Sequence, residues 1–170
     1  MLKKKYWLLL FICLYILSVD QWTKYVIQQR LPPYLRVEVI YGFFNLTHVR
    51  NTGGAFGIFG GDKGGFGSLL FIVVSLIAIG ILLFLFFKMK EEKEMISFSF
   101  SLVLAGAIGN LIDRLHYGEV IDFLDFHLFS YHWPAFNIAD SAITIGVILL
   151  GYGLLIQGKK SNKSQAPNNK

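Results

Sequence analysis

The length, composition and charge of the chain exclude an ordinary soluble domain. It has 170 residues, of which 54% are hydrophobic, with a mean hydropathy of +0.53 and a net charge of +5. This length suits one domain, and this hydropathy is typical of a membrane protein. A positive charge is also a feature of nucleic-acid-binding proteins, but here the lysines gather in short groups outside the apolar segments, so we expect no nucleic-acid partner.

Four apolar segments are long enough to cross a bilayer, which takes about 20 mostly apolar residues. In chain order, helices are expected at about 6–27, 66–87, 95–112 and 138–156. The first segment also resembles a secretory signal peptide, but no small-x-small cleavage site follows it, so we expect a retained helix. The second segment carries no charge at all.

The lysines predict the orientation of these helices. They precede the first helix at residues 3–5, separate the second from the third at residues 88–93, and follow the fourth from residue 159. Four crossings place all three groups on one side, and the positive-inside rule makes that side cytoplasmic. We therefore expect a multi-pass protein of the cell membrane with both termini in the cytoplasm and its polar connections near the outer face.

The two outward connections differ in pattern. In the first, "RVEVIY" alternates polar and apolar residues, "FFNLTHV" is rich in β-branched and aromatic residues, and "NTGG" is typical of a turn, so a short β element is expected. The second, residues 113–137, mixes aromatic and charged residues and is expected at the membrane interface. Residues 1–158 are thus one membrane domain, and the polar residues 159–170 are expected to form a disordered cytoplasmic tail.

Polar residues at the outward ends of the helices form the candidate site. They are Asp20 with Lys24, Asn51, the helical stripe of Gly106, Asn110 and Asp113 with Arg114 beside it, and Asp122, Asn137 and Asp140. A charged side chain at the bilayer centre costs roughly 2.5–3.5 kcal/mol on insertion scales, so such residues need partners or a wet cavity.

Structural roles are alternatives for most of these groups. They are an orienting ion pair for Asp20–Lys24, interhelical hydrogen bonds for Asn110, a helix-end ion pair for Asp113–Arg114, and an N-cap for Asn137. Glu119 and Asp125, in "GEVIDFLDFH", are expected in a wet interfacial position.

Asp122 and Asp140 are harder to explain by structure alone, because each lies in an apolar context without a Lys or Arg near it in sequence. The histidines lack metal-ligand spacing, and the single Cys13 excludes an internal disulfide and a cysteine metal site. No phosphate-binding loop is present. Two carboxylates that meet at a cleft can share one proton and activate water without a covalent intermediate, metal or cofactor.

Five sequence blocks occur in order along the chain: "DQWTK", "NTGGAFG", "GAIGNLIDR", "GEVIDFLDF" and "FNIADSAITIG". Together they resemble the lipoprotein signal peptidase (signal peptidase II) family, from Asp20 to the fourth helix. One position departs: Gly54 stands where the family's Asn-x-Gly-Ala-Ala block has Ala.

The resemblance implies a mainly α fold, a four-transmembrane-helix bundle with a small outward-facing β-cradle and an interfacial helical segment. It implies a bacterial membrane aspartic endopeptidase that cleaves diacylglyceryl-modified prolipoproteins just before the lipidated Cys. Its partners would be this substrate and membrane lipids, and we expect a monomer. The family's catalytic pair matches Asp122 and Asp140. The positions that support or shape the site match Asp20, Lys24, Asn51, Gly106, Asn110, Arg114, Asn137 and Ala139, to which Asp113 is added because it shares the helical stripe.

Apolar neighbours favour the protonated form of Asp122, whereas the first turn of the fourth helix favours charge on Asp140. We therefore expect Asp140 to be the base and Asp122 to carry the proton. A proton-coupled transporter and a structural scaffold are the alternatives. The clustering of charges at one membrane face argues against the first, and the second requires no paired acids.

Overall fold

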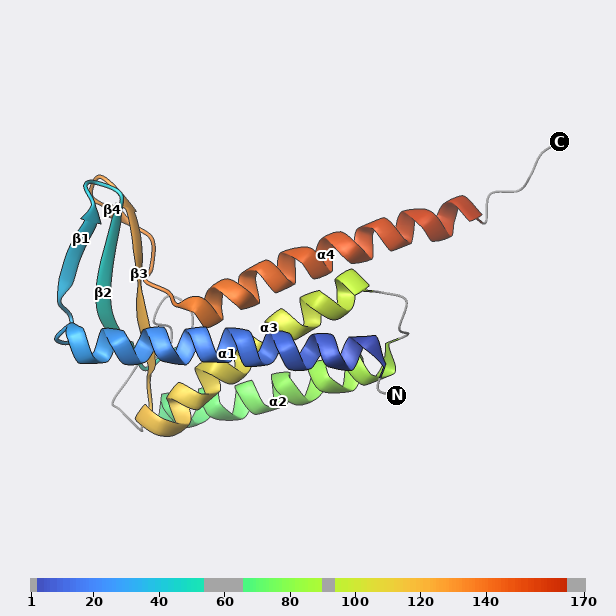
Figure 1. Ribbon diagram of the computed structural model, residues 1–170, viewed down its shortest axis with the longest axis horizontal. Helices are drawn as coiled ribbons and strands as arrows, with labels where there is room; N and C mark the ends of the chain where they lie inside the picture. The colour runs from blue at the N-terminus through green and yellow to red at the C-terminus, as the bar shows by residue number, and fades with distance from the viewer. Residues whose placement is uncertain (1–2, 54–65, 90–93, 165–170) are drawn as a thin grey trace.

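The computed structural model describes residues 3–53, 66–89 and 94–164, and within them four long helices form a bundle with a small sheet at one end (Figure 1). The helices are α1 (Lys4–Arg30), α2 (Phe66–Lys88), α3 (Glu94–Tyr117) and α4 (Ile138–Ser164). All four are long and apolar enough to cross a membrane. The first turn of α1 and the last turn of α4 lie at the end of the bundle away from the sheet.

The helices correspond to the four expected segments, but their ends differ. α3 continues past residue 112 to Tyr117, so Asp113 and Arg114 lie on the helix itself. α4 continues to Ser164 and includes residues 159–164, which were expected to be disordered. The rest of the expected tail, residues 165–170, lies outside the described residues. So does Gly54, the position at which the sequence differs from the family's Asn-x-Gly-Ala-Ala block.

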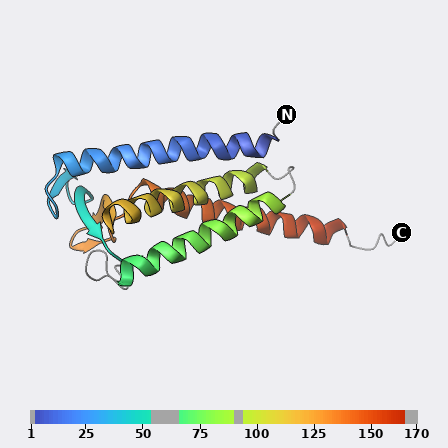
Figure 2. The same cartoon turned by 90° about the horizontal axis from the view of Figure 1, so that it is seen from below.

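α3 is the central helix of the bundle. It packs against α1, α2 and α4, and Figure 2 shows it between α1 and α2. In the most apolar stretch of each helix, 72% of the residues of α3 are buried, but only 6% of those of α1 and 6% of those of α2. Its buried face includes small side chains, among them Ser97, Ser101, Ala105 and Gly106, which allow neighbouring helices to approach closely. The outer helices therefore present most of their apolar surface to lipid.

The sheet is antiparallel, with strands in the order β1 (Arg36–Ile40), β2 (Phe44–Asn51), β3 (Val120–Leu128) and β4 (Tyr131–His132). β1 and β2 confirm the β element expected in the first connection. In the second connection, where the resemblance implied an interfacial helical segment, residues 120–128 form a strand that pairs with β2. Within the described ranges there is no interfacial helix separate from the four long ones.

Gly118 turns the chain from α3 into β3. Its φ of 74° lies in the left-handed region, and its N–H donates to the carbonyl oxygen of Arg114 over 3.0 Å. Glycine adopts this conformation without the Cβ penalty of other residues and commonly ends helices in this way. The turn places Asp122 two residues into β3, close to the end of α3.

Asp125 links all four strands, and the wet position expected for it is wrong. Only 2% of Asp125 is exposed. Its carboxylate accepts hydrogen bonds from Asn45 Nδ2 of β2 over 3.0 Å and His132 Nδ1 of β4 over 2.8 Å, and pairs with Arg36 Nε of β1 over 3.0 Å. Burial alone would raise the pKa of Asp125, but these partners outweigh it and hold the pKa below its ordinary value. Glu119 is likewise buried and pairs with Arg50.

Candidate active site

Asp122 and Asp140 line the same pocket, which has a volume of about 960 Å³ and lies where the sheet meets α3 and α4. Asp122 comes from β3 and Asp140 from the first turn of α4. The described lining consists of Val49, Arg50, Asn51, Thr52, Gly53, Asn110, Arg114, Val120, Asp122, Trp133, Pro134, Ala135, Phe136, Asp140, Ser141, Ile143, Thr144 and Ile145. Two acids from different elements, a strand and a helix, thus face one space.

Asn137 contacts both acids. Its Oδ1 accepts the backbone N–H of Asp140 over 2.9 Å, and its own N–H donates to Asp140 Oδ2 over 3.3 Å, which is a reciprocal capping arrangement at the start of α4. Because Oδ1 is engaged in this way, Nδ2 points the other way and donates to Asp122 Oδ1 over 2.7 Å. Asn137 is therefore both the N-cap considered from sequence and a bridge between the two carboxylates.

Asp122 is held by a second amide. Asn51 Nδ2 donates to Asp122 Oδ2 over 3.1 Å, while Asn51 Oδ1 accepts the backbone N–H of Gly53 over 3.0 Å. Burial raises the pKa of Asp122 to about 7, the nearby Asp140 carboxylate adds to the increase, and the hydrogen bonds from Asn51 and Asn137 partly offset it. Asp122 can therefore hold a proton near neutral pH.

Asp140 is also held by neutral donors. Asn110 Nδ2 of α3 donates to Asp140 Oδ1 over 2.7 Å, and the other oxygen accepts from the backbone of Asn137. Within the described part of the chain, neither Asp122 nor Asp140 forms an ion pair with Lys or Arg. Amide donors fix both carboxylates without neutralising them, which leaves the pair free to exchange a proton.

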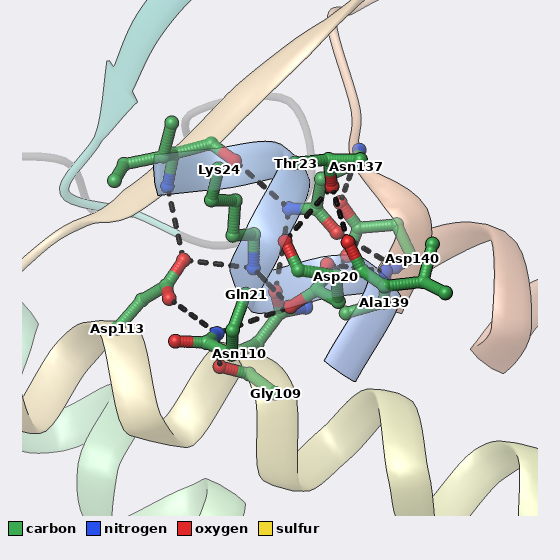
Figure 3. Close-up of polar contacts among 12 residues, drawn as sticks. Asp20, Gln21, Thr23, Lys24, Gly109, Asn110, Asp113, Asn137, Ala139 and Asp140 are labelled. Carbon is green, nitrogen blue, oxygen red and sulfur yellow. Dashed lines mark hydrogen bonds and ion pairs between the residues drawn. The ribbon is translucent and has the colours of Figure 1, made fainter. Parts of the chain in front are cut away.

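Beside the pocket lies a buried cluster centred on Lys24 (Figure 3). Lys24 Nζ pairs with Asp20 Oδ2 and with Asp113 Oδ2, each over 2.8 Å, and donates to Asn110 Oδ1 over 3.3 Å. The Asp20–Lys24 pair expected from i,i+4 spacing is present. The Asp113–Arg114 pair considered from sequence is wrong, because adjacent residues point to different faces of a helix.

The cluster holds the backbone next to each acid of the pocket. Asp20 Oδ1 accepts the N–H of Ala139 over 2.9 Å, and Asp113 Oδ2 accepts the N–H of Ile121 over 3.2 Å. Ala139 directly precedes Asp140, and Ile121 directly precedes Asp122. One lysine and two carboxylates thus connect α1 and α3 to both segments that carry the paired acids.

Arg114 lies on the pocket wall rather than in the Lys24 cluster. Its Nη2 donates to the carbonyl oxygen of Gly53 over 3.4 Å, and its guanidinium lies over the ring of Phe71 of α2, 5.4 Å from the ring centroid. The contact connects α3 to the end of the segment that carries Asn51. The guanidinium of Arg114 is also a cationic group at the pocket surface.

Gly106 and Ala139 let α3 and α4 approach closely. A Cβ on Gly106 would lie 2.7 Å from Ile143 Cγ1 and closer still to the carbonyl oxygen of Ala139. We expect Gly106→Ala to lower the stability by about 1–3 kcal/mol, the usual cost of overpacking, as measured by thermal unfolding in detergent. Gly80→Ala on α2 is the matched control, since a Cβ there meets no atom within 4 Å. Equal melting temperatures for the two variants would contradict this explanation.

Sequence reasoning missed Gln21, whose side-chain nitrogen reaches Asp20, Asp113 and the carbonyl oxygen of Gly109. The available signal was its position, three residues before Lys24 and therefore on the same helix face. It also missed several lining residues, among them Arg50, Thr52, Trp133, Ser141 and Thr144. No spacing rule singles these out, because they meet only through the fold.

The four helices and the polar centre at one end of the bundle define a multi-pass membrane protein. A solved structure described as a bacterial membrane enzyme, determined by the in meso method at 2.3 Å resolution, has the same fold with a TM-score of 0.81. It is 37% identical in sequence, and the match covers 95% of this chain and 94% of that one. A second such structure, at 1.9 Å resolution, matches with a TM-score of 0.77.

Sequence comparison gives the family. The model of signal peptidase (SPase) II matches residues 12–156. The lipoprotein signal peptidase of Syntrophus aciditrophicus is 44% identical over 86% of this chain and 91% of its own length. That of Syntrophotalea carbinolica is 42% identical over 94% of this chain and 96% of its own length. The chain belongs to the signal peptidase II family, and is therefore a peptidase with a role in the cleavage of signal peptides from lipoprotein precursors.

Proposed function

We propose that the protein is an aspartic endopeptidase that removes the signal peptide of diacylglyceryl-modified prolipoproteins by cutting just before the lipidated Cys. The observation that carries the aspartic mechanism is the arrangement of Asp122 and Asp140, which share one pocket, are joined by Asn137, and are held only by amide N–H donors in the described residues. The resemblance to the family supplies the lipidated substrate and the position of the cut.

In this mechanism Asp140 is the base and Asp122 the acid. The Asp140 carboxylate takes a proton from water as the water oxygen attacks the scissile carbonyl carbon, and Asp122 gives its proton to the carbonyl oxygen. In the second step Asp140 returns its proton to the leaving amine nitrogen, and Asp122 recovers a proton from the gem-diol as the C–N bond breaks. The raised pKa of Asp122 and the place of Asp140 in the first turn of α4 support this division.

The pocket suits a substrate that stays in the membrane. It lies at the sheet end of the bundle, and its α4 wall contains Ile143 and Ile145. Ile145 and, further along α4, Val147 and Ile148 are each more than half exposed, and they offer an apolar surface for acyl chains. With both termini in the cytoplasm, the sheet and pocket face outward. The monomeric state expected from the sequence stays part of this proposal.

The test is cleavage of a purified diacylglyceryl-modified prolipoprotein by the purified protein in detergent or liposomes, followed as release of the signal peptide. We expect turnover without added cofactor. Failure to cleave several such precursors, with the protein folded, would contradict the proposed function.

The raised pKa of Asp122 predicts the pH dependence of the reaction. Because Asp122 must be protonated and its pKa is about 7, kcat/KM should fall as the pH rises through about 7. In the unfolded chain, Asp122 loses this proton near its ordinary pKa of about 4. Between about pH 4 and 7 the folded state therefore binds more protons than the unfolded state, so the free energy of unfolding should decline as the pH rises through that window. Asp122→Asn should remove this part of the decline. A constant kcat/KM from pH 6 to 9 would contradict the assignment.

Metal chelators and reagents directed at Ser or Cys nucleophiles should leave activity unchanged. The described pocket lining contains no His or Cys, and the hydroxyl of Ser141 donates to the backbone of Asn137 over 2.9 Å rather than to a base. The check is turnover after dialysis against a chelator, with and without zinc added back. Loss of activity that zinc restores would overturn the metal-free mechanism.

A further inference from the structure

Gln21 of α1 contacts both carboxylates of the Lys24 cluster. Its Nε2 donates to Asp113 Oδ1 over 2.9 Å, to Asp20 Oδ2 over 3.2 Å and to the carbonyl oxygen of Gly109 over 3.3 Å (Figure 3). Three oxygen atoms around one side-chain nitrogen fix the amide orientation, because the reverse orientation would place a fourth oxygen among them.

The cluster needs this donor because its charges do not balance. Lys24 provides one positive charge for two buried carboxylates, and Lys24 and the backbone of Ile121 engage only Oδ2 of Asp113. Gln21 is the donor that the structure gives to Asp113 Oδ1. Without it, a buried carboxylate oxygen loses its hydrogen bond, and the single ammonium group of Lys24 is left to offset the repulsion between the two carboxylates.

We propose that Gln21 is a positioning residue for the cleavage reaction. It fixes Asp20 and Asp113, and these in turn hold the backbone N–H groups of Ala139 and Ile121, the residues directly before Asp140 and Asp122. Gln21 touches neither acid of the pocket and acts through the cluster. The inference rests on the proposed function, since it concerns the alignment of that acid pair.

Two variants separate hydrogen bonding from space filling. Gln21→Met keeps the length of the side chain but has no N–H, and should lower kcat roughly 10- to 100-fold with KM within about twofold, because small misplacements act on the chemical step. Gln21→Glu adds a third carboxylate near Asp20, Asp113 and Lys24 when ionised, but supplies an O–H donor when protonated. Its kcat, as a ratio to the wild-type value at the same pH, should therefore rise as the pH falls from 8 to 5.5.

The ratio to wild type removes the titration of Asp122 and Asp140, which both proteins share. Gln29→Met and Gln29→Glu are the matched controls, since Gln29 is exposed on the same helix about two turns further on. They should follow the wild-type pH profile. Thermal unfolding at each pH shows that the compared proteins are folded, and if Gln21→Met does not fold, the pH ratio of Gln21→Glu is the deciding measurement.

Wild-type kcat for Gln21→Met, or Gln21→Glu activity that stays low at every pH, would overturn the positioning role. The wild-type protein in the same series tests the proposed function separately. An inactive wild type contradicts that function, whereas an active wild type with an equally active Gln21→Met removes only the inference about Gln21.

Discussion

Asp122→Asn and Asp140→Asn should each reduce cleavage of a lipidated precursor by at least roughly 10²- to 10⁴-fold, the range that general acid–base catalysis contributes. An amide is close in shape to a carboxylate but cannot take a proton from water or give one to the scissile carbonyl oxygen. The measurement is kcat with saturating precursor in detergent or liposomes.

Both variants should fold and insert into the membrane, because the Lys24 cluster and the helix contacts do not depend on the charge of either acid. Melting temperatures close to that of the wild type are the control. Asp125→Asn is the comparison variant, because the Asp125 carboxylate is on β3 like Asp122 but is not part of the described pocket lining. It should affect the stability of the sheet more than the chemical step. Wild-type turnover in either Asp122→Asn or Asp140→Asn would show that the acid pair is misassigned.

The second large effect concerns the lipid on the substrate. A precursor without its diacylglyceryl group should be cut at least about tenfold more slowly, even at saturating concentration. Acyl chains contribute roughly 0.8 kcal/mol per buried CH₂, and binding energy that orients the scissile bond appears in the chemical step as well as in affinity. The measurement compares kcat and KM for one precursor with and without the lipid.

Arg114 and Asn51 provide the variants for this comparison. Arg114 presents its guanidinium at the pocket wall, whereas Asn51 is already engaged with Asp122 and Gly53. Arg114→Ala should therefore reduce the preference for lipidated precursor if it holds the substrate near the lipidated Cys, while Asn51→Ala should lower kcat for both precursors. Equal cleavage of lipidated and unlipidated precursors by the wild type would mean that the protein is an acid protease of the membrane that does not recognise the lipid.

The sequence predicted those features that depend on local pattern. Hydropathy located the four helices, and i,i+4 spacing paired Asp20 with Lys24. Alternation indicated β1, and β-branched and aromatic residues indicated β2. The lack of a counter-charge nearby in sequence made Asp122 and Asp140 candidates, and the resemblance to the family matched them to its catalytic pair. The structure places both in one pocket.

Features that depend on tertiary contacts were not predictable in this way. Asp125 is buried because Arg36 and Asn45, about 80 to 90 residues earlier in the chain, reach it across the sheet. Residues 120–128 form a strand because β2 pairs with them, although their mixed pattern alone does not distinguish strand from interfacial helix. The pairing of Asp113 with Lys24 depends on the packing of α1 against α3, which no sequence spacing shows.

The central claim is tested most directly by mass spectrometry of both products formed from a diacylglyceryl-modified precursor. The proposed function predicts a single cut, with the lipidated Cys as the new N-terminal residue of one product and an intact signal peptide ending in a free carboxyl group as the other. The same analysis of Asp122→Asn and Asp140→Asn should show uncut precursor. A cut at another bond, or the same products from either variant at the wild-type rate, would contradict the account.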